Sequence, residues 1–233
     1  MQPGLPVLKI AFSARERAAI RTHRARRILN VAVAAVGIVL TLPLMVLIAV
    51  AVKLTSRGPV IHRQPRVGVD RRGLSYARGN TRRHFDLGGK LFTIYKFRTM
   101  HADDSSNGRE VWAQADDKRI TPVGRLLRRL RFDELPQLFN VLKGDMNVVG
   151  PRPEQPTLFV ELRELIQGYQ RRQRVLPGIT GLAQVTLSYD RSVDDVRRKL
   201  RVDLDYIRHE SVLRDLAIMV RTIPVMLRMR GGW

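Results

Sequence analysis

The chain has 233 residues, which is enough for one domain or for one domain with an appendage. It contains no cysteine, and this excludes disulfides, thiolate metal sites and cysteine nucleophiles. Its 42 Lys and Arg residues against 21 Asp and Glu give a formal net charge of +21. We therefore expect an anionic partner, such as nucleic acid, anionic lipid headgroups or a phosphorylated substrate.

An apolar segment at 31–52 has no ionisable side chain and consists mainly of Val, Ala, Leu and Ile. At about 1.5 Å per residue, a helix of this length just crosses a hydrocarbon core of about 30 Å. It is too long, and too far from residue 1, for an ordinary signal-peptide core. A buried helix of a soluble protein is the alternative, which the length disfavours. The sequence thus predicts a membrane helix over 28–54, after a basic lead-in at 1–27.

Two features of this helix favour a re-entrant hairpin over a straight span. Basic residues flank both ends, whereas a spanning helix normally keeps its basic end on the cytoplasmic side. Pro43 lies in the middle, where it removes a backbone hydrogen bond and bends the helix, and Thr41 can bond to the disturbed backbone. We expect the helix to enter, bend near Pro43 and return to the same face. A kinked spanning helix remains the alternative, because proline is common in membrane helices.

The remaining residues, 55–233, have the pattern of a mainly α domain with little β-structure on the membrane surface. Residues 91–95 form a β-type run, and the polar stretches 70–86 and 102–117 indicate exposed loops. Leucine and arginine alternate in one predicted helix in a way that suits a membrane interface, and Pro224 kinks another. The predicted helices cover 125–130, 156–174, 193–209 and 212–229.

The adjacent carboxylates Asp133 and Glu134 lie where another short helix is predicted to begin. Pro136 is tolerated only in a first turn, and Gly144 stands where the helix would end. Two interpretations are open at this point. Asp133 can cap the helix, with Glu134 as a favourable charge near its positive end. Alternatively, the pair can bind a metal and receive a phosphoryl group.

Five further motifs follow the proline-broken membrane helix in a fixed order. They are Gln64-Pro-Arg-Val-Gly68, IYKFRTM ending at Met100, GRLLRRLRFDELPQLFNVLKGDMNVVGPRPE from Gly124, PGITGLAQV from Pro177 and DLDYIRHESVLRDLAIM from Asp203. In these motifs the chain resembles the bacterial sugar transferase family, the monotopic polyprenyl-phosphate phosphoglycosyl transferases. The resemblance covers nearly all of the chain after Arg27, and six motifs in order are far more specific than one.

The resemblance implies a two-step transfer of a sugar-1-phosphate from a UDP-sugar to undecaprenyl phosphate. Asp133 would attack the phosphorus that carries the sugar, and a phosphosugar–aspartyl intermediate would pass to the lipid phosphate. Asp133 and Glu134 would hold Mg²⁺, or Glu134 would handle a proton. The enzyme would lie in the bacterial inner membrane, with its catalytic domain on the cytoplasmic face, and begin exopolysaccharide, capsule or O-antigen synthesis.

The same resemblance implies a set of substrate-binding residues. Three of them, Lys96, Arg128 and Arg152, are cations whose positions in the motifs would let them bind phosphate oxygens. Protein solubility or contact with lipid headgroups would also explain these three residues. Arg98 can instead have a structural role, by forming an ion pair with an acidic residue near the start of the helix. The set is Lys96, Arg98, Arg128, Arg152, Glu154 and Gln184.

The chain departs from the family pattern in two places. The segment between Gly68 and Lys96 is longer than in minimal members, and Leu130 and Arg131 replace small hydroxyl residues. Two other functions remain: a non-catalytic basic protein on the membrane surface, and a lipid-phosphate hydrolase that uses the same carboxylates. We expect no nucleic-acid partner, because aromatic residues are few and no binding module is visible. Apolar membrane helices often associate, so a homo-oligomer is possible.

Overall fold

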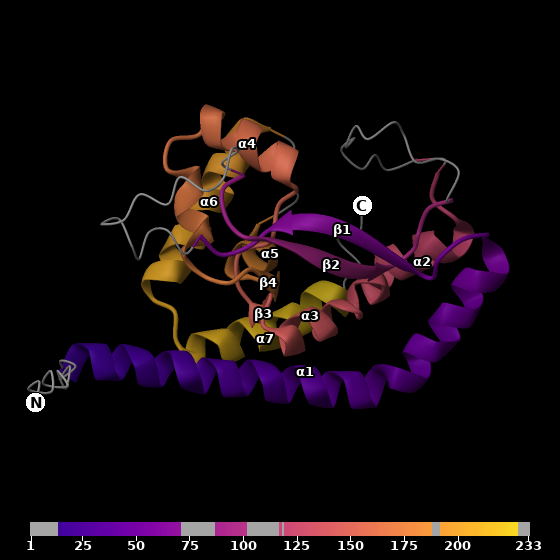
Figure 1. Cartoon of the computed structure of the whole chain (residues 1–233), viewed down its shortest axis with the longest axis horizontal. Coiled ribbons are helices and arrows are strands. Elements are labelled where there is room, and N and C mark those ends of the chain that lie inside the picture. Colours follow the sequence, from indigo (N-terminus) through magenta and orange to yellow (C-terminus); the bar gives the residue numbers. More distant parts are fainter. Residues whose placement is uncertain (1–13, 71–86, 102–116, 118, 188–191, 228–233) are drawn as a thin grey trace, which may run out of the picture.

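The computed structural model describes residues 14–70, 87–101, 117, 119–187 and 192–227, with side chains from residue 23 onward. These parts are mostly helical with little strand, as predicted (Figure 1). The elements in chain order are α1 (Ala14–Thr55), β1 (Ile61–Val67), β2 (Leu91–Phe97), α2 (Pro122–Leu130), the 3₁₀ helix η2 (Phe132–Glu134), α3 (Gln137–Lys143), β3 (Asn147–Val149), α4 (Pro156–Leu165), the 3₁₀ helix η3 (Tyr169–Arg174), β4 (Gly178–Thr180), α5 (Leu182–Thr186), α6 (Val193–Arg208) and α7 (Val212–Leu227).

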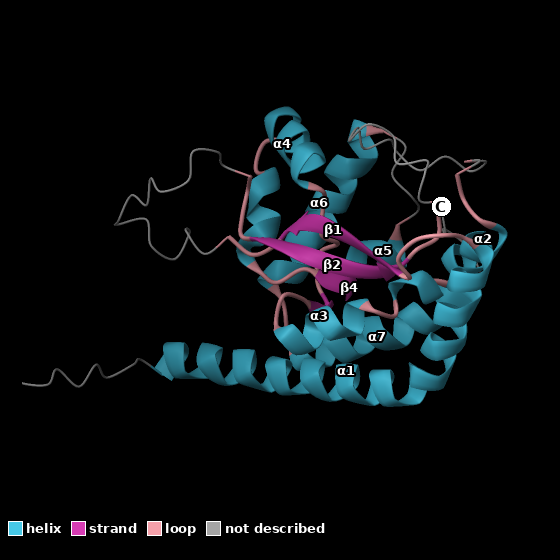
Figure 2. Ribbon diagram, turned by 45° about the vertical axis from the view of Figure 1, so that its right-hand side comes forward, coloured by secondary structure: helices cyan, strands magenta, loops and turns pink. Residues whose placement is uncertain are grey.

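Helix α1 is the long apolar helix that the sequence predicts. Its part from His23 to Thr55 is long and apolar enough to cross a membrane. The helix is continuous through Pro43, and its C-terminal part turns toward α2 (Figures 1 and 2). The Thr41 hydroxyl donates to the Gly37 carbonyl at 2.7 Å, a backbone contact of the kind that bends helices. α1 therefore has two legs, the first before this bend and the second after it.

The first leg is fastened to the rest of the domain by a buried cation. The Arg26 guanidinium lies 2.8 Å from the Asp215 carboxylate and 2.5 Å from that of Glu210, and it donates to the Tyr206 hydroxyl at 2.6 Å. Tyr206 donates in turn to Asp215 at 2.7 Å. Arg26 is 6% exposed and Asp215 is fully buried. This part of the basic flank therefore binds α7 and the end of α6.

Two more side chains of the first leg bond to backbone groups of other elements. Asn30 is fully buried, and its carbonyl oxygen accepts the amide N–H of Val148 in β3. Arg27 donates to the carbonyls of Val141 and Leu142, at 2.6 and 2.9 Å, near the C-terminal end of α3. The carbonyl end of a helix carries partial negative charge, so a cation there is favourable. The contacts explain why α1 lies along α3 and α7 in Figure 2.

The second leg packs on the β-hairpin and on α2. Met45, Ile48 and Val52 form an apolar cluster with Phe97 of β2 and Leu127 of α2. β1 and β2 are antiparallel, with Ile61 opposite Phe97 and Val67 opposite Leu91. The predicted run 91–95 is confirmed as part of β2, whereas β1 was not predicted. Its Pro65 cannot donate to a strand ladder, but a two-stranded sheet has an outer edge where no donor is needed.

A second, parallel pair of strands fixes the Gly-Pro-Arg-Pro-Glu corner at 150–154. β3 pairs with β4, with Asn147 opposite Gly178. Beyond the pair, Gly150 donates to the Thr180 carbonyl at 2.9 Å and Gly178 donates to the Pro151 carbonyl at 3.0 Å. A Cβ on Gly178 would overlap the backbone of Gly150, so the two segments approach closely only because both residues are glycine.

The C-terminal half departs from the predicted helices at two points, the segment 156–174 and the short helix α5, which was not predicted. Residues 156–174 do not form one helix, because the chain turns at Gly168 (φ +81°) between α4 and η3. α6 and α7 match the predictions for 193–209 and 212–229, with Pro224 inside α7. The two predicted loops lie almost entirely outside the described residues, at 71–86, 102–116 and 118, as do residues 1–13 of the predicted lead-in. The rest of the lead-in, 14–27, belongs to α1, so the helix begins well before the predicted residue 28.

Replacing Arg26 with Met should lower the free energy of unfolding by about 3–5 kcal/mol, because the Asp215 carboxylate would remain buried without its cation. Thermal unfolding in detergent measures the effect. Arg24→Met removes the same charge from an exposed position and should change stability little. Adding Asp215→Leu to Arg26→Met should restore part of the loss, and no restoration would contradict the role of the ion pair.

Candidate active site

The two carboxylates lie in a tight turn between α2 and α3. α2 ends at Arg131, the one described residue other than glycine with positive φ (+61°). The 3₁₀ helix η2 follows and carries Asp133 and Glu134, both buried. α3 begins at Gln137 and ends, as predicted, at Gly144. The cap positions before η2 and α3 are Arg131 and Pro136, so Asp133 caps neither helix, and the cap interpretation is wrong.

Glu134 is held by two cations from distant parts of the chain. Its Oε1 lies 2.9 Å from Lys96 Nζ on β2 and 2.8 Å from Arg152 Nη2 in the corner after β3. Arg131 approaches the same oxygen at 4.0 Å. Burial alone would raise the pKa of Glu134, but Arg152 and Lys96 hold the pKa well below its ordinary value. Glu134 is therefore a firmly ionised carboxylate.

Asp133 differs from its neighbour. No ion pair reaches Asp133 among the residues that the structure describes. Burial raises its pKa above the ordinary value, Lys96 counteracts this, and the charge of Glu134 raises the pKa further. Two neighbouring carboxylates whose surroundings push their pKa values apart are suited to different roles. Glu134 holds the cations in place, whereas Asp133 has no ion pair of this kind among the described residues.

The cations named from sequence fall into two groups. Lys96, Arg152 and Arg128 gather around the pair, and the charge of each acts on Asp133. Arg128 is held in place by the Thr99 hydroxyl, to which its Nε donates at 2.8 Å. Arg98 is buried and donates to the carbonyl and hydroxyl of Ser56 at 2.7 and 2.8 Å. It joins the end of α1 to β2 and pairs with no acid there.

Glu154 belongs to a second buried cluster, centred on Arg172. The Arg172 guanidinium lies 3.0 Å from Glu154 and 2.9 Å from Asp203 of α6, and it donates to the Arg152 carbonyl at 3.1 Å. Tyr169 accepts from the same guanidinium. Burial would raise the pKa of Glu154, but Lys199, 3.4 Å away, and Arg172 hold it at about 2. The cluster thus fixes the backbone of Arg152, whose side chain binds Glu134.

Gln184 also lies behind the corner and not beside the carboxylates. It is on α5, where its amide nitrogen donates to the Ile179 carbonyl at 3.1 Å. Its amide oxygen is buried close to Gly181, the residue that precedes α5. Gln184 therefore supports the Pro177–Gly181 turn, and the structure gives it no contact with Asp133 or Glu134.

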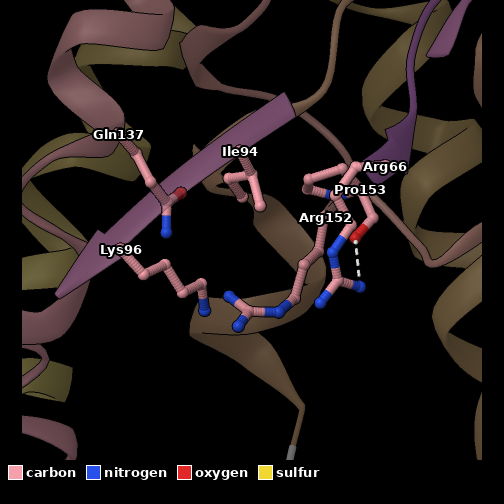
Figure 3. A pocket seen from close by; sticks show the side chains of 6 residues that line it. All are labelled: Arg66, Ile94, Lys96, Gln137, Arg152 and Pro153. Carbon is pink, nitrogen blue, oxygen red and sulfur yellow. Dashed lines mark hydrogen bonds between the residues drawn. The ribbon is translucent and has the colours of Figure 1, made fainter. Parts of the chain in front are cut away.

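A small recess opens between the hairpin and the corner, next to the cations (Figure 3). Its volume is about 10 Å³, which holds one water-sized group. Four of its six residues were not predicted as site residues, and the two polar ones among them are Arg66 and Gln137, which both stand in the motifs. The lining residues are Arg66, Ile94, Lys96, Gln137, Arg152 and Pro153.

The donor set is compatible with a hard divalent cation. Among the described residues no three or more His, Asp or Glu side chains gather as a metal site. Mg²⁺ is commonly held by one or two carboxylates, with phosphate oxygens and water completing its shell. Asp133 and Glu134 supply two carboxylates of this kind, although one oxygen of Glu134 already faces two cations.

The model of the bacterial sugar transferase family matches residues 21–229 of this chain. A UDP-N-acetylgalactosamine-undecaprenyl-phosphate N-acetylgalactosaminephosphotransferase of Aeromonas hydrophila is 41% identical over 202 residues, which are 87% of this chain and 43% of that protein. A UDP-glucose:undecaprenyl-phosphate glucose-1-phosphate transferase of Caulobacter vibrioides is 39% identical over 230 residues, 97% of this chain and 75% of that protein. The chain thus spans less than half of the first relative and three quarters of the second.

The Glu154 cluster should make stability depend on pH in acid. The pKa of Glu154 is about 2 in the folded chain and 4.5 ordinarily, so folding favours the ionised form. Its contribution is complete above pH 4.5 and is lost as the pH falls toward 2. Comparing Glu154→Gln with the parent by thermal unfolding, we expect the stability difference to shrink by about 3 kcal/mol over this range. A difference that stays constant would contradict the assignment.

Proposed function

Because the chain belongs to the bacterial sugar transferase family, we propose that it transfers a sugar-1-phosphate from a UDP-sugar to undecaprenyl phosphate. The observation that carries this proposal is the unequal carboxylate pair. Glu134 is tied to Lys96 and Arg152, while Asp133 lies beside them without an ion pair among the described residues. A free carboxylate surrounded by cations suits an attack on a phosphorus atom whose oxygens are negatively charged.

In the first step, an Asp133 carboxylate oxygen attacks the phosphorus that bears the sugar. A bond forms from that oxygen to phosphorus, the bond to the bridging diphosphate oxygen breaks, and UMP leaves with the electron pair. In the second step, an oxygen of the lipid phosphate attacks the same phosphorus, and the Asp133 carboxylate is released. Lys96, Arg128 and Arg152 stabilise the negative charge on the phosphoryl oxygens in both steps.

Mg²⁺ is the proposed cofactor, and Asp133 and Glu134 would hold it. When bound, it would neutralise diphosphate charge and favour the departure of UMP. The chain's own residues have a separate task. Glu134 keeps Lys96 and Arg152 at fixed positions before substrate arrives, so little reorganisation is needed when charge develops.

The membrane arrangement that we propose is re-entrant, with the domain on the cytoplasmic face of the inner membrane. It is supported by the contacts of both legs of α1 with the same domain, through Arg26 and Asn30 on one leg and Val52 on the other. If α1 crossed the membrane as a straight span, its two legs would lie on opposite sides, and they could not both contact the same domain. Between them the apolar side chains are largely exposed, with Val39, Leu40 and Leu47 at 71, 74 and 67%. Lipid is the natural partner of such a surface.

Release of UMP tests the chemical proposal. Protein in nanodiscs with Mg²⁺, undecaprenyl phosphate and a panel of UDP-sugars should release UMP, and Asp133→Asn should reduce the rate by roughly 10³-fold or more, because the nucleophile is lost. Asp194→Asn, at an exposed position of α6, is the matched control and should retain activity. Undiminished release by Asp133→Asn would exclude Asp133 as the nucleophile. Release of inorganic phosphate from undecaprenyl phosphate, without release of UMP, would instead indicate the lipid-phosphate hydrolase.

Single cysteines test the topology, since the chain has none of its own. Ala25→Cys on the first leg and Gln167→Cys in the domain both occupy exposed positions. With a re-entrant helix, a maleimide that cannot cross the inner membrane should label neither in intact cells and both after permeabilisation. Labelling of Ala25→Cys alone in intact cells would show that the helix spans the membrane.

A further inference from the structure

The recess beside the carboxylates contains a buried hydrogen-bond donor that the fold does not use. Gln137 is 2% exposed, and its amide nitrogen has no hydrogen-bond partner among the described residues. In Figure 3 this amide lies on the same side as the Lys96 ammonium, at the recess. A buried donor without a partner costs about 1–3 kcal/mol, and such exceptions call for an explanation.

A neighbouring amide on the same helix shows what a structural role looks like. The Asn140 amide nitrogen donates to the Thr93 carbonyl at 2.7 Å, and its oxygen accepts the Tyr95 N–H at 3.1 Å. Both bonds join α3 to β2. Gln137 lies one turn earlier and is equally buried, but it makes no such bond to the strand. Packing of α3 on the hairpin therefore does not require the amide of Gln137.

The residues that line the recess determine which kind of ligand it can bind. Arg66, Lys96 and Arg152 contribute three positive charges, while Ile94 and Pro153 contribute apolar surface. The volume of about 10 Å³ admits one oxygen-sized group, and not a whole phosphate or sugar ring. A single anionic oxygen fits this space, because guanidinium, ammonium and amide groups all donate and none of them except the amide can accept.

We propose that the recess is a subsite for one non-bridging phosphoryl oxygen, with the Gln137 amide as donor and Arg66 as an additional cation. This rests on the proposed function and adds two positioning contacts to it. The phosphorus would then lie at the mouth of the recess, within the field of the cations that Glu134 holds. The oxygen belongs either to the UDP-sugar or to the lipid phosphate, since both phosphoryl groups must reach Asp133.

Substitution of Gln137 by Leu tests the proposal in the full-length chain. The loss of one bond to a charged phosphate should weaken binding of the affected ligand about 10- to 100-fold. UDP, inorganic pyrophosphate and undecaprenyl phosphate in nanodiscs are the probes, measured by titration calorimetry. Weaker binding of UDP and pyrophosphate alone assigns the oxygen to the sugar nucleotide, and weaker binding of the lipid alone assigns it to the acceptor. Either result supports the subsite.

The melting temperature of the free protein separates binding from structure. Gln137→Leu should leave it unchanged or raise it, because an unused buried donor is replaced by an apolar group of similar size. Asn140→Leu is the matched control and should lower it, since Thr93 and Tyr95 lose their partners. Gln137→Glu provides a second variant that keeps the size and repels phosphate. Unchanged affinity of Gln137→Leu for all three probes would overturn the proposal.

Failure of the subsite proposal can be distinguished from failure of the proposed transferase activity. If the parent chain binds UDP through Gln137 but releases no UMP from any UDP-sugar, the subsite stands and the transferase assignment fails. If UMP is released and Gln137→Leu has wild-type affinity and KM, the transferase assignment stands and the subsite fails.

Discussion

One carboxylate oxygen organises the centre of this molecule. Glu134 Oε1 accepts from Lys96 and from Arg152, and these residues belong to the hairpin and to the corner after β3. Three segments that are far apart in the sequence therefore meet at a single atom. Because Glu134 is buried, its charge depends on these cations, and removing either one would leave the other to compensate it. The same arrangement leaves Asp133 surrounded by positive charge without an ion pair of its own among the described residues.

A second buried cluster supports the first. Arg172 binds the backbone of Arg152 and the carboxylates of Glu154 and Asp203, so α6 and η3 fix the position from which Arg152 reaches Glu134. Only the first cluster contains Asp133 and Glu134, the pair for which we propose a chemical role. Glu154 was predicted as a substrate-binding residue, either directly or through a neighbour, and its partners in the structure make it a support for the corner. Such supporting residues commonly determine how accurately a site is positioned.

Local patterns predicted the longer helices and β2, but not the short elements β3, β4 and α5. β2, α2, α6, α7 and the end of α3 at Gly144 follow from apolar spacing and from turn residues. β1 was missed because Pro65 and its charged neighbours resemble a loop, and the break at Gly168 was missed because a single glycine can be tolerated within a helix. The gathering of Lys96, Arg128 and Arg152 was expected from a family resemblance. The burial of Arg26 and the unused amide of Gln137 depend on contacts between distant segments, which no local pattern contains.

The docking of α1 has a consequence for the order in which the chain folds. Arg26 and Asp215 are 189 residues apart, so the first leg cannot complete its contacts until α7 has been synthesised. Contacts of such long sequence separation slow folding, because a large loop must close before they form. During translation α1 is therefore without its final partners while most of the domain is made. A membrane that receives the apolar second leg early would shield it during this interval and limit aggregation.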